Sequence, residues 1–122
     1  MSKRDVKKVE KPWGHELIWA QTGDYVGKII FIKKGQRLSL QFHEVKEETI
    51  YVMSGVMSFH FEENGVLSET VLKAGEAHHI PPMRKHRMTA VEDCTVLEVS
   101  TPQLGDVVRI EDAYGRAGTN AP

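Results

Sequence analysis

The sequence predicts a single all-β domain, built as a barrel or as a two-sheet sandwich. Short runs rich in β-branched and aromatic residues recur about every ten residues, and turn-forming residues separate them. No segment of useful length has apolar residues at helical spacing. With 122 residues and 40% hydrophobic content, the chain is long enough to bury one core, and we expect no second domain.

Ten strands follow from this pattern. The first eleven residues are charged and lack periodicity, so we expect a mobile N-terminal arm over residues 1–11, a domain over residues 12–116 and a tail over residues 117–122. Asn64-Gly65, after the alternating run VMSFHF, is the clearest hairpin signal. The expected strands are Trp13–Ala20, Val26–Lys33, Arg37–His43, Thr49–Met53, Val56–Phe61, Leu67–Leu72, His78–Ile80, His86–Val91, Thr95–Ser100 and Val107–Ile110.

Charge and cysteine content exclude several classes of function. The 16 basic and 17 acidic residues nearly cancel, so no overall field favours nucleic acid or an anionic membrane. The one cysteine, Cys94, excludes an intramolecular disulfide and a cysteine-cluster zinc site, and its apolar neighbours indicate a buried residue. No apolar run reaches the roughly 20 residues of a membrane helix, and the N-terminal residues do not resemble a signal peptide, so we expect a cytoplasmic protein.

The run Arg37–His43 has a mixed character if it is extended. Alternation divides it into two faces, an apolar one with Leu38, Leu40 and Phe42 and a polar one with Ser39, Gln41 and His43. A polar face that simply meets water is one interpretation. Glu48 follows five residues after His43, so the alternative is that donor atoms of these side chains converge on one metal ion when the chain folds back.

Two groups of residues at fixed spacing match the two motifs of the cupin superfamily. Gly35, Gln41, His43, Glu48 and Gly55 fit the intervals of the first motif, and Gly75, Pro81 and His86 fit those of the second. The chain therefore resembles the cupins, which implies a single-domain β-barrel of the jelly-roll type, or double-stranded β-helix. Three positions depart from the common pattern, since Gln41, Met83 and Ala90 stand where many cupins have histidine, glycine and asparagine.

Several further segments resemble a narrower family. The run LSLQFH, the opening KPWG and the closing DVVRIEDAYGR are similar to the C-terminal domain of type II mannose-6-phosphate isomerases, over roughly residues 11 to 116. Those proteins are bifunctional, and the chain contains no counterpart of their nucleotidyltransferase half, so we expect no GDP-mannose synthesis. Where the family has a histidine-rich segment, this chain keeps His43, Lys46 and Glu48 but not its other polar and aromatic side chains.

The resemblance implies a metal site formed by Gln41, His43, Glu48 and His86. Two imidazoles, a carboxylate and an amide oxygen suit one divalent ion per chain, with Zn as the first choice and Mn, Fe, Co or Ni as alternatives. The competing interpretation is that these four residues form a hydrogen-bonded polar core without a metal.

The resemblance also implies an aldose–ketose isomerase that acts on a sugar phosphate. The candidate catalytic residues are His79, Glu111 and Arg109, and the candidate substrate-binding residues are Lys46, Arg109 and His60. A non-catalytic protein that binds a sugar or another small molecule, and a cupin enzyme of another type such as a dioxygenase, remain alternatives. We expect a homodimer in which sheet edges are covered.

Overall fold

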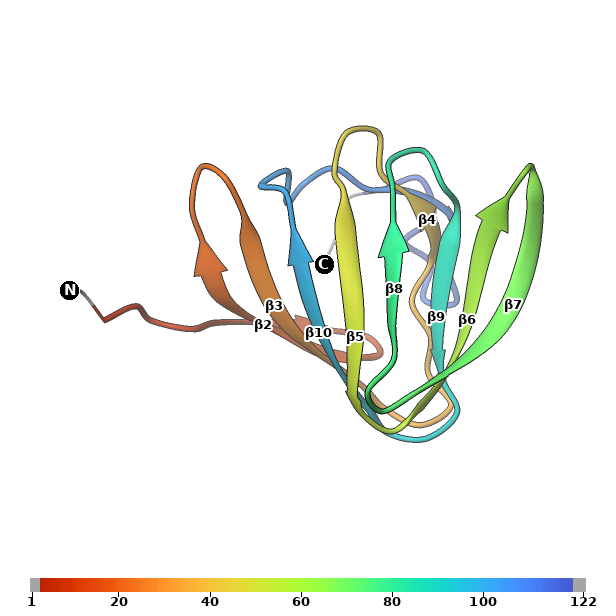
Figure 1. Cartoon of the computed structure of the whole chain (residues 1–122), viewed down its shortest axis with the longest axis horizontal. Helices are drawn as coiled ribbons and strands as arrows, with labels where there is room; N and C mark the ends of the chain where they lie inside the picture. Colours follow the sequence, from red (N-terminus) through yellow and green to blue (C-terminus); the bar gives the residue numbers. More distant parts are fainter. Residues whose placement is uncertain (1–2, 120–122) are drawn as a thin grey trace.

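The computed structural model describes residues 3–119 as two antiparallel β-sheets packed face to face (Figure 1). The six-stranded sheet has the order β1-β2-β3-β10-β5-β8, and the five-stranded sheet has the order β11-β4-β9-β6-β7. The chain crosses between the sheets after β3, β4, β5, β7, β8, β9 and β10, as in a jelly roll. This confirms the all-β fold class. Within residues 3–119, no helix is long and apolar enough to span a membrane.

Each strand expected from the sequence overlaps an observed one. The run Arg37–His43 differs most, because it is extended only over three residues and otherwise contributes a single bridge between Arg37 and Thr89. The strands are β1 (Lys7–Lys11), β2 (Gly14–Gln21), β3 (Val26–Ile32), β4 (Leu40–Phe42), β5 (Glu48–Ser54), β6 (Val56–Glu63), β7 (Val66–Lys73), β8 (Ala77–Ile80), β9 (His86–Ala90), β10 (Cys94–Ser100) and β11 (Val108–Glu111).

The N-terminal segment differs from the mobile arm that the sequence predicts. Lys7–Lys11 forms β1, which pairs with β2 at the edge of the six-stranded sheet and places Lys11 opposite Gly14. An edge strand exposed to solvent needs no strong apolar alternation, and charged residues are common there, so the sequence pattern hides it. The outer ends of the expected arm and tail, residues 1–2 and 120–122, lie outside the described residues.

The turns behave as the sequence predicts at two positions. Asn64 and Gly65 have φ values of 53° and 75°, so both central residues of the β6–β7 hairpin are left-handed, as a type I′ turn requires. Gly55, the closing glycine of the first motif, has a φ of 92°, and a Cβ there would lie 2.1 Å from the carbonyl oxygen of Asp93. No larger residue fits Gly55 without moving the β9–β10 connection.

The core occupies the end where the two sheets converge, at the β3–β4, β5–β6 and β9–β10 connections (Figure 1). Cys94 is fully buried there, which confirms its expected role as a small core residue. Toward the other end, the inward positions change from apolar to charged. In β5, the inward-facing Ile50 is followed toward that end by the inward-facing Glu48. In β10, the inward-facing residues toward the same end are, in order, Cys94, Val96, Glu98 and Ser100.

Candidate metal centre

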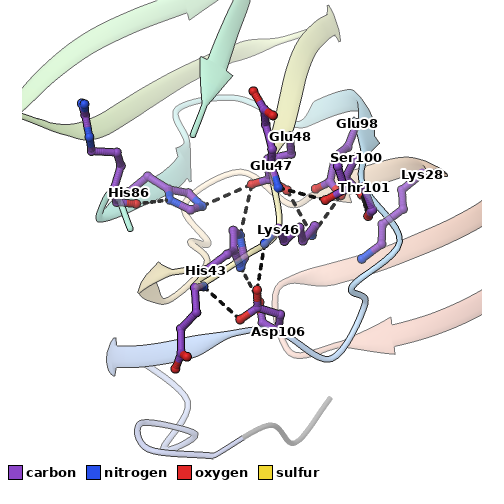
Figure 2. A network of polar contacts seen from close by, with 12 residues as sticks. Lys28, His43, Lys46, Glu47, Glu48, His86, Glu98, Ser100, Thr101 and Asp106 are labelled. Carbon is purple, nitrogen blue, oxygen red and sulfur yellow. Dashed lines mark hydrogen bonds and ion pairs between the residues drawn. The ribbon is translucent and has the colours of Figure 1, made fainter. Parts of the chain in front are cut away.

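Three side chains from separate elements converge at the charged end of the barrel (Figure 2). His43 follows β4, Glu48 begins β5 and His86 begins β9. The β4–β5 and β8–β9 connections lie at the same end of the fold (Figure 1), which brings the two sequence motifs together. All three side chains are buried, and one potential ligand atom of each lies within 4.8 Å of the others.

Hydrogen bonds determine which nitrogen of each imidazole faces this centre. Nδ1 of His43 lies 2.6 Å from the carbonyl oxygen of Asp106, and Nδ1 of His86 lies 2.9 Å from that of Arg84. Because a carbonyl oxygen only accepts, both Nδ1 atoms donate. Both Nε2 atoms therefore face Glu48, each 3.3 Å from its Oε1. Metal-binding histidines use this arrangement, with the second ring nitrogen held by a backbone carbonyl.

The donor atoms fit a divalent metal. In the neutral tautomers, two nitrogen lone pairs and a carboxylate oxygen meet at one point with no proton between them. Nε2 of His86 is buried and has no hydrogen-bond partner among residues 3–119, which costs free energy unless something binds there. Two imidazole nitrogens and one carboxylate oxygen suit Zn, Mn, Fe, Co or Ni.

Gln41, the predicted fourth ligand, lies beside these three residues. It pairs with His86 of β9 on one side and with Arg109 of β11 on the other. Its side chain lines the same cavity as His43 and Glu48. Gln41 therefore remains the candidate fourth ligand.

A polar cavity of about 70 Å³ lies in the barrel beside this centre and is lined by His43 and Glu48. It is larger than the roughly 30 Å³ that one water molecule occupies in the liquid. Titratable side chains from both sheets line it, namely Lys11, Glu16, Lys28, His43, Lys46, Glu48, Glu98 and Arg109. Charged side chains therefore surround the space beside the three residues that could hold a metal.

Lys46 joins two buried carboxylates in this cavity (Figure 2). Its Nζ lies 3.1 Å from Oε2 of Glu48 and 3.3 Å from Oε2 of Glu98. Burial opposes the charge of Lys46, but Glu98 and Glu48 outweigh it and raise the pKa of the ammonium. Burial likewise opposes the charge of Glu48, yet the charge of Lys46 and the contacts with His43 and His86 hold its pKa well below the usual range. Glu48 is therefore ionised, the form that binds a metal.

Glu98 is a cavity residue that the sequence interpretation missed. It is 4% exposed, and burial together with the charge of Glu48 raises its pKa, while Lys46 and Lys28 oppose this shift. The signal was present in the run CTVLEVS, where period-two alternation puts Glu98 on the same face as the buried Val96. The sequence interpretation also missed a second inward ion pair, between Lys28 and Glu16 at 3.0 Å. Each of these charged residues likewise lies on the same face of its strand as buried apolar residues.

Asp106 connects the closing segment of the chain to the metal site (Figure 2). Its carboxylate accepts hydrogen bonds from the backbone N–H groups of Glu44, Val45 and Lys46, at 3.0, 2.7 and 2.9 Å. Its carbonyl oxygen accepts from Nδ1 of His43. Burial opposes ionisation, but the three backbone donors lower the pKa of Asp106 overall. Asp106 thus holds both the ligand and the loop that follows it.

Residues 2–114 match the protein family described as mannose-6-phosphate isomerase C-terminal. The chain belongs to this family. Among its curated relatives is the alginate biosynthesis protein AlgA of Pseudomonas putida, 34% identical over 116 residues, which cover 91% of this chain and 23% of AlgA. AlgA of Pseudomonas aeruginosa is 32% identical over 119 residues, covering 93% of this chain and 24% of AlgA. The chain thus spans about a quarter of the length of these relatives.

Solved structures share the fold of this family member. KdgF from Halomonas sp. superposes with a TM-score of 0.70 and 24% identity, over 81% of this chain and 88% of KdgF. Oxalate decarboxylase from Bacillus subtilis superposes with a TM-score of 0.77 and 15% identity, over 87% of this chain and 30% of that protein. At such low identity these similarities concern the fold alone, and they confirm the cupin barrel.

The structure does not bring every predicted site residue of this family member into the cavity. Lys46 and Arg109 line it, whereas His79, His60 and Glu111 do not. His79 lies on the outer face of the six-stranded sheet and pairs with Glu47 at 2.5 Å. His60 and Glu111 lie together in a groove on the outer face of the five-stranded sheet. Sequence alternation alone does not say which face of a strand looks inward.

Proposed function

We propose that this chain forms the domain of a cytoplasmic, metal-dependent isomerase that interconverts an aldose phosphate and a ketose phosphate, such as mannose 6-phosphate and fructose 6-phosphate. The observation that carries the proposal is the buried set of His43, Glu48 and His86, which lies beside a charged cavity in a member of the mannose-6-phosphate isomerase family. Zn is the proposed metal, with Mn, Fe, Co and Ni as alternatives.

The positions where the chain departs from the family do not touch this cavity. Glu44 and Val45, which replace family histidines, are exposed and do not line it, and Ile50 is in the core. These three positions lie outside the cavity lining, which supports the isomerase proposal over a non-catalytic binding protein.

The reaction moves a proton from carbon 2 to carbon 1 of the sugar. The hydroxyl proton on the oxygen of carbon 2 moves to the oxygen of carbon 1, so that the carbonyl group passes from carbon 1 to carbon 2. A divalent ion held by the ligands would polarise the substrate carbonyl and stabilise the negative charge that develops on its oxygen. The protein itself must supply a group that accepts the proton from one carbon and returns it to the next.

We assign this proton transfer to Glu98, in place of His79 and Glu111. Glu98 lines the cavity and is not one of the metal ligands. The other non-ligand carboxylate in the cavity, Glu16, accepts a hydrogen bond from Lys28 at 3.0 Å, whereas the contact of Glu98 with Lys46 is longer, at 3.3 Å. Lys46 then has a different role from the predicted contact with substrate, because its ammonium group holds Glu48 and Glu98 in place. Arg109 keeps its predicted role in binding the substrate.

The direct test is an assay for interconversion of mannose 6-phosphate and fructose 6-phosphate by the metal-loaded chain. We expect turnover that is lost on chelation and restored by one of the five metals. Glu98→Gln should keep its metal and lose at least about 100-fold in kcat, which is the usual contribution of a general base. Metal-loaded protein that binds mannose 6-phosphate without converting it would refute the isomerase proposal and favour a sugar-binding protein. Oxygen uptake by the iron form would instead indicate a dioxygenase.

A further inference from the structure

We infer that Lys11, Arg109 and Arg116 form a binding subsite for a phosphate group, next to the metal cavity and on the opposite side of Gln41 from His86. The identity of the anion, the phosphate of a sugar phosphate, rests on the proposed function. The location of the subsite rests on geometry and charge alone.

A second cavity of about 40 Å³ adjoins the first. Both cavities are lined by Lys11, Gln41 and Arg109, but Arg116 lines only the second. The order of strands explains this arrangement, because Gln41 of β4 pairs with His86 on one side and with Arg109 on the other. A ligand that binds both the metal and these cations would therefore lie across Gln41.

Lys11 supplies a cation whose charge is not neutralised. It ends β1 on the inward side of the sheet, and among residues 3–119 its ammonium group has neither an ion pair nor a hydrogen bond. The nearby carboxylate of Glu16 is already paired with Lys28. Burial lowers the pKa of Lys11, and although Glu16 opposes the shift, the charges of Lys28, Arg109 and Arg116 add to it. Lys11 therefore lies within reach of the positive charges of Arg109 and Arg116 without an ion pair of its own.

Arg109 supplies spare hydrogen-bond donors. It is 8% exposed, and one of its N–H groups donates to the carbonyl oxygen of Thr119 at 2.9 Å. A guanidinium group has five N–H donors, and the other four have no partner within the described part of the chain. Arg116 is held rigidly beside it, because its guanidinium donates to both oxygens of Asp112 at 3.0 and 2.9 Å. Its charge is therefore in place before any ligand binds.

This combination favours a phosphate over a neutral group. Asp112 pairs with Arg116 and Glu16 pairs with Lys28, but among residues 3–119 neither Lys11 nor Arg109 has a carboxylate partner. An added anion would therefore relieve the repulsion between Lys11 and Arg109. A phosphate dianion offers several oxygens at once, which matches the planar donor fork of arginine and the point charge of lysine. The cations also come from opposite ends of the sequence, Lys11 from the opening KPWG and the arginines from the closing segment, and the barrel brings them to one place.

Inorganic phosphate is the probe for this subsite. The full chain is stripped of metal, so that turnover plays no part, and phosphate binding is measured by isothermal titration calorimetry. We expect the unmodified chain to bind phosphate, and Lys11→Met and Arg109→Gln each to bind it at least about tenfold more weakly. Lys8→Met is the matched control. It removes the same charge from the same strand, but Lys8 is exposed and pairs with Glu10, so its affinity should not change.

Three results would overturn the inference. The first is that Lys11→Met, Lys8→Met and the unmodified chain bind phosphate with equal affinity, and the second is that the folded chain binds no phosphate. The third is acetate binding as tight as phosphate binding, which would assign a carboxylate instead. Lys11 lies half-exposed at the end of an edge strand, so its replacement does not threaten the fold even if Arg109→Gln does. Because the experiment measures binding without turnover, failure of the isomerase assay leaves its outcome unchanged.

Discussion

At the scale of single residues, the site depends on groups that hold the ligands as much as on the ligands. Nδ1 of His43 and Nδ1 of His86 are both used by backbone carbonyls, so each ring can present only Nε2 to the centre. Such partners typically change metal affinity by about 10–100-fold when they are removed. Asp106 stands out among them, because it holds His43 and three further backbone groups at once.

We predict that Asp106→Asn weakens metal binding by roughly tenfold without changing the fold. The amide keeps one acceptor oxygen but loses the charge that holds the N–H groups of Glu44, Val45 and Lys46. Competition with a metal chelator measures the affinity. Asp93→Asn is the control, since Asp93 makes the same type of bond to the N–H of Lys34 in another loop.

The same variant tests a pH effect. Because the folded pKa of Asp106 is lowered, its stabilising contribution is present above the unfolded pKa of about 3.9 and is lost as the pH falls through the folded value. The difference in unfolding free energy between Asp106→Asn and the unmodified chain should be full at neutral pH and should shrink in acid below about pH 4. A difference that does not change with pH would contradict the assigned role of the carboxylate.

Not all of these residues could be found from the sequence. His43, Glu48 and His86 were predicted because metal ligands recur at fixed local intervals, and the structure brings them together. Asp106 acts across more than 60 residues of sequence, on backbone groups that carry no sequence signal. Glu98 could be found only by asking why a charged residue alternates with buried apolar ones.

At the scale of elements, the β8–β9 connection holds an unusual backbone conformation. Met83 has a φ of 64°, in the left-handed region, where the second cupin motif usually has glycine. Its N–H donates to the carbonyl oxygen of His43 at 2.6 Å, so the connection keeps its contact with the metal site despite the side chain. A left-handed conformation costs a non-glycine residue about 1–2 kcal/mol.

Met83→Gly should therefore stabilise the chain by about 1 kcal/mol, after the greater entropy of the unfolded glycine is subtracted. Met83 is 59% exposed, so little buried surface is lost. Chemical denaturation measures the change. Asn64→Gly is the matched control at a φ of 53°, where the gain should be smaller because asparagine tolerates this conformation. A less stable Met83→Gly would show that the Met83 side chain contributes packing that outweighs the strain.

The strands were predictable wherever one face is apolar. β5 and β10 follow alternation over most of their length, and Asn64-Gly65 specifies its hairpin locally. β1 was not predictable, because pairing with β2 orders it and its own residues carry no such pattern. Tertiary packing likewise determines that His78 rather than His79 faces inward, because His78 packs on Phe59 and Phe61.

At the scale of the whole molecule, the outer face of the six-stranded sheet is apolar. Leu17, Ile29, Leu97 and Tyr51 are neighbours in one row across β2, β3, β10 and β5. Met53, Val99 and Trp19 beside them are each more than 40% exposed. We propose that a second copy of the chain covers this face in a two-fold symmetric dimer, because an apolar face can pair with the same face of another copy.

Light scattering should give a dimer for the unmodified chain and a mass near 13.8 kDa for Tyr51→Glu, which puts a charge in the middle of the row. Val66→Glu places the same charge at an exposed position in β7 of the other sheet and should remain dimeric. The unmodified chain running as a monomer, or Tyr51→Glu remaining dimeric, would contradict this interface.

The central claim is that His43, Glu48 and His86 hold a divalent metal, and elemental analysis of His86→Ala tests it most directly. His78→Ala is the matched control, because His78 also faces inward but packs on aromatic rings and is not one of the ligands. The unmodified chain and His78→Ala should each contain about one divalent ion per chain, and His86→Ala should contain almost none. A folded His86→Ala that keeps the metal content of the unmodified chain would contradict the ligand assignment.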